Sequence, residues 1–509
     1  MSNQQLASID GGFRLEQIIP GSRLIGTQTI KVRSCCSSWR ECEKDDVYVA
    51  IVGDDFDGHD FAQEAISRGA TAVVAERLLA INCPQCLVPD SRKAFGSICH
   101  ALAGTPSDQI STVGIAGSDG KTVTAHLIRS IYRAAGSRVG LISSIEVNTG
   151  RCEAPANGTE LNAPLLADRL GQMVLSGCNH AVVEMPSIAL AQHASSGVRL
   201  DAAVLTNIRR DFRDFHGNDG NYIRAHQRLL EYLKPTGFAV LNADDPTTHY
   251  LLDQIDTPTL TIGIRQAAEI KAKIVERTST DQTFLLQAGS DSVAVRTSII
   301  GDQHVYNCLS ATAVALTTGV PLTTIADGLE AAGAIPGRME RVECGQEFGV
   351  WIDAASSPSQ LATAINAVRK VTRGKVYCVC SVTGDQTDGH RKRMGEIIER
   401  AADQAVITKA AIREHVDYEP FHQVLDGFTK PAGAEVIPNR FNAIEWALSR
   451  AGAGDAVLVA GSGERSIGSV GEKCWPISDR DVCQAWLYDR VKPESQQPGQ
   501  DIYKIDDYR

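Results

Sequence analysis

Short apolar runs alternate with amphipathic stretches of helix length along most of the chain. DVYVAIVG at 46–53 is followed by FAQEAISRGA at 61–70 and then by TAVVAE at 71–76. Apolar strands that alternate with helical segments are typical of parallel sheets covered by helices. The pattern therefore predicts an α/β fold.

Two turn-rich segments interrupt this alternation. AGTPSDQIS, around Pro106, precedes the apolar strand STVGIAG, and AAGAIPG, which ends at Gly337, precedes the strand GVWIDA. Proline and glycine clusters between periodic segments mark loops and domain boundaries. The polar C-terminal segment has the composition of a solvated tail. We expect an N-terminal domain at 1–108, a central domain at 109–335, a C-terminal domain at 336–492 and a tail at 493–509.

The composition narrows the classes of function. The 509 residues are 43% hydrophobic and 22% charged, which excludes a collagenous or wholly disordered chain. The 61 acidic and 50 basic residues give a formal net charge of −11, which argues against nucleic acid as the main partner. No apolar run reaches the roughly 18 residues of a membrane span, and the start of the chain lacks the pattern of a secretory signal. We therefore expect a cytoplasmic protein without membrane insertion.

The 14 cysteines are scattered singly or in close pairs, which is not the pattern of a disulfide framework. Cys83 and Cys86 have the spacing of a zinc or redox site, and Cys99 and His100 are conceivable further ligands. No second CxxC completes a tetrahedral set, so the role of this pair stays open.

The segment from Gly114 to Thr122 has the features of a phosphate-binding loop. Glycines let successive backbone N–H groups point at an anion, and the helix that follows adds its positive N-terminal end. Lys121 would reach the terminal phosphates, and the Thr122 hydroxyl would ligate Mg²⁺. Ile115 stands where the strict motif has its first glycine, and the alternative is a glycine-rich turn with an exposed lysine. We favour nucleotide binding, by the loop residues Gly117, Ser118, Asp119, Gly120, Lys121 and Thr122.

A carboxylate follows the next strongly apolar strand, HAVVEMPS, at Glu184. Side chains at the carboxyl ends of parallel strands face the ligand crevice of a doubly wound sheet. We therefore expect Glu184 to lie beside the loop, where it would suit Mg²⁺. The alternative for this residue is a cap on the next helix.

Further motifs follow in a characteristic order over almost the whole chain. They are GSDGKT at 117–122, VVEMPS at 182–187, VLTNIRRDFRDFHG at 204–217, LNADDP at 241–246, HVYNCLSA at 304–311, PGRME at 336–340 and GDQTDGHRKRMG at 384–395. In order and spacing the chain resembles the Mur ligase family, and most closely its MurE type, the UDP-N-acetylmuramoyl-L-alanyl-D-glutamate ligases.

The resemblance implies an N-terminal domain for the UDP part of the substrate, a central ATPase domain and a C-terminal Rossmann-like domain that brings the amino acid. It implies ATP and Mg²⁺ as cofactors, a UDP-sugar peptide or related acid and an amino acid as partners, and ligation through an acyl-phosphate in peptidoglycan precursor synthesis.

The resemblance also assigns roles to residues. It puts Lys121 and Thr122 on the phosphates and Glu184 on the first metal. It implies that Asn307 lies near adenine and that the third domain supplies Arg338 and Asp353 to the nucleotide. Taken alone, Arg338 could form a surface ion pair and Asp353 could cap a strand end.

The motif around the second metal departs from the family pattern. The family's Arg-Asp-His reads Arg210-Asp211-Phe212, and His226 replaces a lysine that becomes carbamylated in the family. Neutral imidazole carries no negative charge, and Mg²⁺ prefers oxygen ligands. We expect a weak or lost second site, with Mn²⁺ favoured over Mg²⁺ for any second ion. The alternative for His226 is a plain helix-surface or half-buried histidine.

Substrate contacts that the resemblance implies are also thinned. Arg40, Thr159, Ser187 and Arg413 remain as candidate substrate-binding residues, whereas Ala194 replaces an arginine. The groups expected to read the distal end of diaminopimelate are replaced as well. Their positions hold Ala410, Ala411, Ile412, Glu464 and Arg465.

Two hypotheses follow from the retained and the lost residues. The first is a divergent ATP-dependent amide ligase, which we favour because Lys121, Thr122 and Glu184 are retained. The second is a pseudoligase that binds nucleotide or precursor and acts by interaction, which Phe212 and His226 favour. A phosphate-loop kinase or GTPase would not show this order of motifs.

Overall fold

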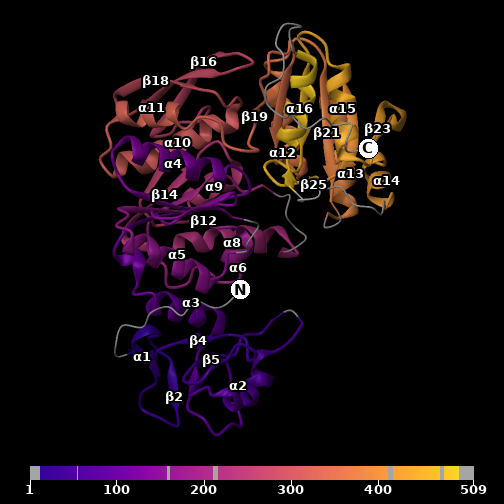
Figure 1. Cartoon of the computed structure of the whole chain (residues 1–509). Coiled ribbons are helices and arrows are strands. Elements are labelled where there is room, and N and C mark those ends of the chain that lie inside the picture. The colour runs from indigo at the N-terminus through magenta and orange to yellow at the C-terminus, as the bar shows by residue number, and fades with distance from the viewer. Residues whose placement is uncertain are drawn as a thin grey trace, which may run out of the picture. The chain divides into compact units, whose positions relative to one another are not determined.

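The computed structural model describes residues 12–53, 55–156, 161–209, 216–383, 386–410, 417–470 and 475–491. The chain divides into two compact units, which are described separately below (Figure 1). The first unit covers 1–208 and 220–261, and the second covers 209–219 and 262–509. No helix among the described residues is long and apolar enough to cross a membrane.

A five-stranded sheet forms the N-terminal part of the first unit, with the strand order β2-β7-β6-β5-β4. Its strands are β2 (Arg23–Ile25), β4 (Cys35–Cys36), β5 (Val47–Val49), β6 (Ala72–Ala75) and β7 (Gln85–Leu87). All neighbours pair in parallel except β2 with β7. Helix α3 (Ser91–Leu102) packs on one face of the sheet and α2 (Ala62–Arg68) on the other. The remaining elements here are β1 (Phe13–Arg14), α1 (Leu15–Ile18), β3 (Lys31–Val32), η1 (Gly58–Phe61) and η2 (Pro106–Asp108).

The larger sheet of the first unit has a parallel centre. It has eleven strands, and the first eight follow the order β11-β10-β9-β12-β8-β13-β14-β15. They are β8 (Ser111–Ala116), β9 (Val139–Ile142), β10 (Glu146–Asn148), β11 (Glu153–Pro155), β12 (His180–Glu184), β13 (Leu200–Leu205), β14 (Leu233–Asn242) and β15 (Thr259–Gly263). Its helices are α4 (Lys121–Ala134), α5 (Ala163–Leu175), α6 (Ser187–Ala191), α8 (Asp219–Glu231) and α9 (Pro246–Leu252). Because β9, β12, β8 and β13 run in parallel, their carboxyl ends share one edge of the sheet.

The second unit contains an antiparallel meander of β16 (Ile270–Arg277), β17 (Gln282–Ala288) and β18 (Asp291–Thr297). Strand β16 also pairs in parallel with Ile262 and Gly263 at the end of β15, so the meander continues the eleven-stranded sheet. A separate sheet of six strands has the order β19-β20-β24-β21-β22-β23 and is parallel apart from β19. Its strands are β19 (Glu340–Arg341), β20 (Gly349–Asp353), β21 (Val376–Val382), β22 (Gln404–Lys409), β23 (Ala434–Val436) and β24 (Ala456–Ala460).

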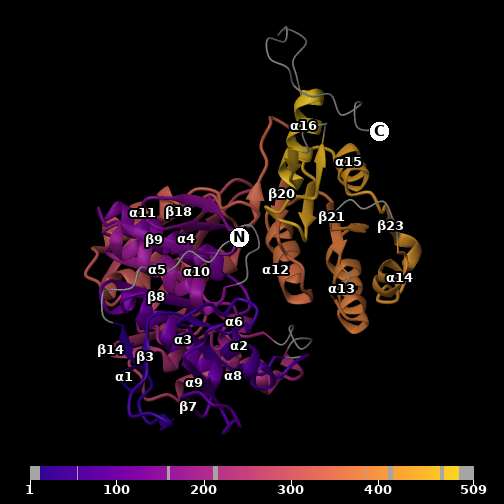
Figure 2. The same ribbon diagram turned by 60° about the horizontal axis from the view of Figure 1, so that its bottom comes forward.

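Helices cover both faces of this parallel sheet. One core contains α12 (Pro358–Arg369), α13 (Asp388–Ala401) and α14 (Glu419–Leu425), and the other contains α15 (Arg440–Arg450) and α16 (Asp479–Val491). Figure 2 shows α12 and α13 on one side of β21 and α15 and α16 on the other. The remaining elements are α10 (Asp302–Thr317), α11 (Leu322–Ala331), η3 (Pro431–Gly433), β25 (Gly468–Val470) and β26 (Trp475–Ile477). The α/β fold expected from the sequence is confirmed.

A buried ion pair joins the first residues of α15 and α16. Arg440 Nε lies 2.6 Å from Asp479 Oδ1, and Nη2 lies 2.7 Å from Oδ2. Both side chains are fully buried. Such a pair is costly to break, because the partner that remains is a buried charge without its counter-charge.

We predict that Asp479→Asn lowers the free energy of unfolding by roughly 3–5 kcal/mol. The matched control is Glu343→Gln, whose ion pair with Arg341 is half exposed and should contribute less than about 1 kcal/mol. Urea denaturation of the full chain, followed by circular dichroism, measures both effects. Equal losses in the two variants would contradict this account of the pair.

Candidate functional site

The glycine-rich loop connects β8 to α4 in a conformation that depends on glycine. Gly117 has a φ of +140° and Gly120 one of +85°. A Cβ atom on Gly117 would lie 2.1 Å from Thr206 Oγ1, so no other residue fits there without displacing the loop. Helix α4 begins at Lys121, and its first N–H groups therefore face the loop.

Two polar residues after β13 hold this loop. Ser118 N–H donates to the Asn207 carbonyl at 2.9 Å, and Asp119 N–H donates to Asn207 Oδ1 at 3.1 Å. The Asp119 carbonyl accepts from Thr206 Oγ1 at 2.6 Å and from Asn207 Nδ2 at 3.0 Å. Asn207 is buried, so these bonds are shielded from water and fix the loop against the neighbouring strand.

The Lys121 side chain folds back over its own loop. Its Nζ donates to the Gly117 carbonyl at 2.9 Å and to the Ser118 carbonyl at 3.2 Å. The ammonium group is half-buried and lies above the backbone that the glycines expose. This position lets the charge reach an anion in the loop by a change of side-chain rotamer.

Oxygen atoms of the buried residues Thr122 and Glu184 and of the exposed Ser144 form a cluster beside the loop. Thr122 Oγ1 donates to Glu184 Oε2 at 3.0 Å and lies 2.9 Å from Ser144 Oγ. The Ser144 N–H donates to the same carboxylate oxygen at 2.9 Å. Thr122 and Glu184 are only 5% and 6% exposed. The expectation that Glu184 lies beside the loop is confirmed, and the cluster has the hard oxygen ligands that Mg²⁺ prefers.

Helix α8 packs against the other side of the loop. The Tyr222 hydroxyl lies 2.7 Å from Ser118 Oγ. The His226 ring meets the Tyr222 ring edge-on, with centroids 4.6 Å apart, and is fully buried. His226 is therefore a core residue, and the alternative of a helix-surface or half-buried histidine was wrong. Phe212, the other departure at this motif, lies outside the described residues.

Three candidate nucleotide residues lie in the second unit. Asn307 is buried on α10, where Gln303 Nε2 donates to its Oδ1 at 3.4 Å. Asp353 ends β20 and accepts from the N–H groups of Met339 and Ala355 at 2.7 and 2.9 Å. This carboxylate therefore caps the strand end, as its alternative proposed.

Arg338 forms an ion pair with Glu464, with 2.6 Å between Nη1 and Oε2. Both side chains are mostly buried, at 19% and 21% exposed, so the pair is not the surface contact considered from the sequence. Gly337 fits the backbone between them, because a Cβ atom there would lie 2.3 Å from the Glu464 nitrogen.

The candidate substrate residues are only partly described. Arg40 lies on the turn after β4, with its guanidinium 4.8 Å from the centre of the Trp39 ring. Ser187 is the first residue of α6, just beyond Glu184. Thr159 and Arg413 lie outside the described residues.

Cys99 and His100, the further ligands considered for the CxxC pair, have other contacts. Cys86 is buried on β7, whereas Cys99 faces Cys35 with 3.9 Å between the sulfur atoms. His100 Nε2 lies 2.8 Å from Ser107 Oγ, and burial lowers the pKa of His100 to about 4. Among the described residues, Cys83 and Cys86 belong to no group of three ligand atoms.

Comparisons with known proteins place this site in a family. Residues 115–315 match the Mur ligase middle domain, and residues 337–463 match the Mur ligase glutamate ligase domain. The chain is 35% identical over 451 residues to the UDP-N-acetylmuramoyl-L-alanyl-D-glutamate–2,6-diaminopimelate ligase of Geobacillus thermodenitrificans, which covers 87% of this chain and 92% of that one. The chain belongs to the Mur ligase family.

Further similarities agree with this assignment. The same ligase of Listeria monocytogenes serotype 4b is 30% identical, over 92% of this chain and 96% of its own. A solved structure of a ligase with that name has a TM-score of 0.67 at 22% identity, over 95% of this chain and all of its own. MurF ligase from Thermotoga maritima in complex with ADP has a TM-score of 0.61 at 20% identity, over 90% of this chain and 99% of its own. These two structures show the shared fold.

This Mur ligase is an ATP-dependent amide ligase of peptidoglycan synthesis. Relatives that are at least 30% identical over most of the chain are named as ligases, which supports the ligase hypothesis over the pseudoligase.

Reasoning from the sequence missed four residues of the site. These are Ser144, Thr206, Asn207 and Tyr222. Two of them, Thr206 and Asn207, follow the apolar strand β13, just as Glu184 ends β12. Polar residues at the carboxyl ends of neighbouring strands were the available signal.

We predict that Lys121→Ala weakens the binding of ATP and of ADP by roughly 10- to 150-fold, because an ion-to-phosphate bond contributes on the order of 1.5–3 kcal/mol. Calorimetric titration measures the affinity. Lys93→Ala, an exposed lysine on α3, is the control and should bind like the unchanged protein. Equal affinity in the Lys121 variant would refute the role of this ammonium group.

Proposed function

We propose that this Mur ligase joins an amino acid to the carboxylate of a UDP-muramoyl peptide or a related acid. ATP would bind at the 117–122 loop, with Mg²⁺ on Thr122 and Glu184. The observation that carries the proposal is the placement of Lys121, Thr122 and Glu184 around one loop whose backbone is fixed by Asn207. Nucleic acid and membrane have no part in this proposal.

The loop fits a phosphate chain in both shape and charge. Gly117 lets the loop pass close to Thr206 and Asn207, and the N-terminus of α4 adds a partial positive charge. Lys121 would neutralise charge that builds on the transferred phosphoryl group. ATP supplies the phosphoryl group that activates the carboxylate for attack by the amine.

The oxygen cluster fits a single Mg²⁺. Thr122 offers a hydroxyl and Glu184 a carboxylate, and Ser144 keeps that carboxylate in place through its N–H group. Both ligand types are hard oxygen donors. We also propose Asn307, Arg338 and Asp353 as residues on the nucleotide and Arg40, Thr159, Ser187 and Arg413 as residues on the substrates.

We predict that Glu184→Gln sharply reduces the dependence of ATP affinity on Mg²⁺. The amide can still accept the Ser144 N–H, so the fold should persist, but the negative charge that attracts the cation is gone. ATP titrations with and without Mg²⁺ measure how much the metal raises the affinity for ATP. This increase should be smaller by about tenfold or more in the variant than in the unchanged protein. Glu231→Gln, at the exposed end of α8, is the matched control. An unchanged metal effect in the Glu184 variant would remove Glu184 from the metal site.

The second metal is proposed to be weak or absent. His226 offers a neutral nitrogen in place of an anionic oxygen, and its ring is buried against Tyr222. Any second ion should therefore be Mn²⁺ rather than Mg²⁺. This expectation rests on His226 alone within the described part of the chain.

The acceptor amino acid is proposed to lack a distal ammonium group. Glu464, the acidic residue of the 461–465 loop, is already paired with Arg338. Arg465 donates from the same loop to the carbonyls of Gly461 and Ser462 at 3.0 and 3.2 Å. Its cation would repel a distal ammonium group. This proposed preference differs from the diaminopimelate in the names of the relatives.

We predict that meso-diaminopimelate has a kcat/KM at least about 100-fold lower than the preferred amino acid, because its distal charge would stay unpaired. Phosphate release with ATP, Mg²⁺ and UDP-N-acetylmuramoyl-L-alanyl-D-glutamate, measured against a panel of amino acids, tests both the ligation and the preference. Arg465→Glu should reduce the difference in kcat/KM between meso-diaminopimelate and the preferred amino acid. Arg373→Glu, an exposed charge reversal in the same unit, should leave this difference unchanged.

Two outcomes of this assay have different meanings. Efficient use of meso-diaminopimelate would overturn the proposed specificity and leave the ligase in place. No amino-acid-dependent phosphate release with any acceptor, together with failure to complement a MurE-deficient strain, would overturn the proposed substrates.

A further inference from the structure

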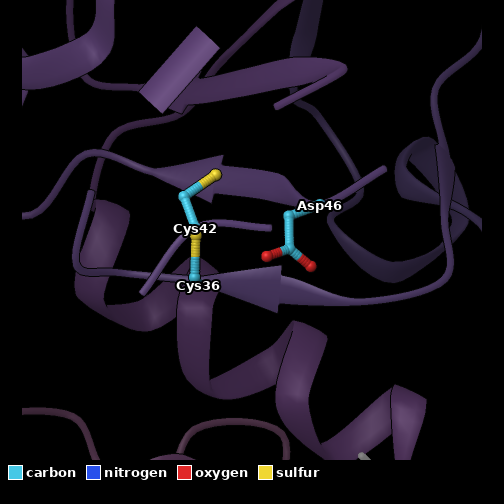
Figure 3. Close-up of side chains that lie close together, drawn as sticks. All are labelled: Cys36, Cys42 and Asp46. Carbon is cyan, nitrogen blue, oxygen red and sulfur yellow. The ribbon is translucent and has the colours of Figure 1, made fainter. Parts of the chain in front are cut away.

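Two cysteines and an aspartate converge in the N-terminal sheet, away from the nucleotide loop. Figure 3 shows Cys36 from β4, Cys42 from the turn that follows it and Asp46 from the residue before β5. Their sulfur and carboxylate oxygen atoms all lie within 4.8 Å of one another. The three residues are 6%, 2% and 7% exposed. They form a buried group of three ligand atoms, called here the Cys36 cluster.

The local backbone holds this cluster together. Strand β4 pairs in parallel with β5, and Cys36 lies opposite Tyr48 in the register. The turn between the strands closes through the Cys42 N–H, which donates to the Trp39 carbonyl at 3.4 Å. Arg68 of α2 donates to the Cys42 carbonyl at 3.2 Å. The geometry therefore comes from both strands and from a helix that covers them.

The charge of Asp46 needs an explanation. Its carboxylate accepts from the Ser34 hydroxyl and, at 2.8 Å, from the Glu43 N–H. Within the described ranges Asp46 forms no ion pair, although its side chain is buried. A buried carboxylate without an ion-pair partner is costly. A metal ion between the three side chains would supply the positive charge.

Apolar packing alone accounts for the thiols but not for the carboxylate. Cys36 and Cys42 belong to a core with Tyr48 and Ala62, where free cysteines behave as small apolar residues. Burial is the largest cause of the raised pKa of both thiols, and the Asp46 charge raises it further. A bound cation reverses this preference, because metal coordination deprotonates thiols.

The opposite face of the same strand provides a contrast. Cys35, the neighbour of Cys36, faces Cys99 with 3.9 Å between the sulfur atoms. These two thiols have no third ligand atom close enough to complete a group in the described structure. Replacing this pair therefore controls for the loss of two cysteines from the same part of the protein.

We propose that Cys36, Cys42 and Asp46 bind one Zn²⁺ ion. Thiolate ligands select soft or borderline metals, and two thiolates with a carboxylate suit zinc better than Mg²⁺ or Ca²⁺. In a tetrahedral site with Zn–S of about 2.3 Å and Zn–O of about 2.0 Å, the ligand atoms lie about 3.5–3.8 Å apart. From separations of at most 4.8 Å, the cluster must contract by about 1.3 Å at most. Water takes the fourth position.

Metal binding in this site is balanced by proton release. Each Zn²⁺ replaces the protons of the Cys36 and Cys42 thiols, so two protons leave for each ion bound at neutral pH. The bound state then carries two thiolates, one carboxylate and one divalent cation, and Arg68 lies close enough to offset the remaining negative charge. The ion would fix the turn that carries Trp39 and Arg40, a link to substrate that rests on the proposed role of Arg40.

The test titrates the full chain, stripped of metal by a chelator and kept reduced with a phosphine, with Zn²⁺ and with Cd²⁺. We expect one tightly bound equivalent, a thiolate-to-cadmium charge-transfer band, and the release of two protons per ion. Zn²⁺ should also raise the melting temperature, since a ligand that binds only the folded state stabilises it. None of these measurements depends on ligase activity, so failure here leaves the proposed function untouched.

Three variants assign the ligands. Cys36→Ala with Cys42→Ala should lose the tight equivalent and the band, whereas Cys35→Ala with Cys99→Ala should keep both. Asp46→Asn should keep a weaker band and lower the affinity by about tenfold or more. This variant and the titration of the unchanged protein remain informative if the double alanine variant does not fold.

Specific results would overturn the proposal. A wild-type protein that binds no tight equivalent of Zn²⁺ or Cd²⁺ excludes the site. Equal loss of binding in the Cys35 and Cys99 variant places the metal elsewhere. An unchanged affinity in Asp46→Asn removes the carboxylate from the ligand set, and a disulfide between Cys36 and Cys42 in the isolated protein makes the pair a redox site instead.

Discussion

The close approach of Gly117 to Thr206 and Asn207 is the constraint on which the proposed nucleotide site depends. Groups after β13 bond to the N–H groups of Ser118 and Asp119 and to the Asp119 carbonyl, in the loop that leaves β8. The loop can turn here only because position 117 has no Cβ atom. Its shape is therefore set by the neighbouring strand before any ligand binds, which is the arrangement that binding and catalysis require.

The same parallel edge brings the charged groups together. Glu184 ends β12, one strand away from the loop, and Ser144 follows β9 on its other side. The buried Thr122 hydroxyl lies between them. Two strands and helix α4 thus supply the oxygen atoms of the proposed cation site, and Lys121 on the same helix lies beside the loop that we propose for the phosphates.

The N-terminal sheet carries a different kind of polar group. Asp46 is buried next to two thiols, in a part of the protein where the other buried groups are mostly apolar. The carboxylates of Glu184 and Asp46 are both buried, and each accepts a hydrogen bond from a backbone N–H group that fixes its orientation. They differ in their neighbours: hydroxyl oxygens beside Glu184 favour Mg²⁺, whereas sulfur beside Asp46 favours zinc.

The sequence by itself determined the α/β class, the loop and its helix, and the position of Glu184 beside them. These follow from local periodicity, from glycine spacing and from the rule that parallel strands share their carboxyl ends. Only the tertiary structure decided that Thr206 and Asn207 hold the loop, that His226 is fully buried against Tyr222, and that Asp46 meets two thiols. Such contacts depend on the register and packing of segments that are far apart along the chain, and a single sequence shows these residues without showing which of them meet.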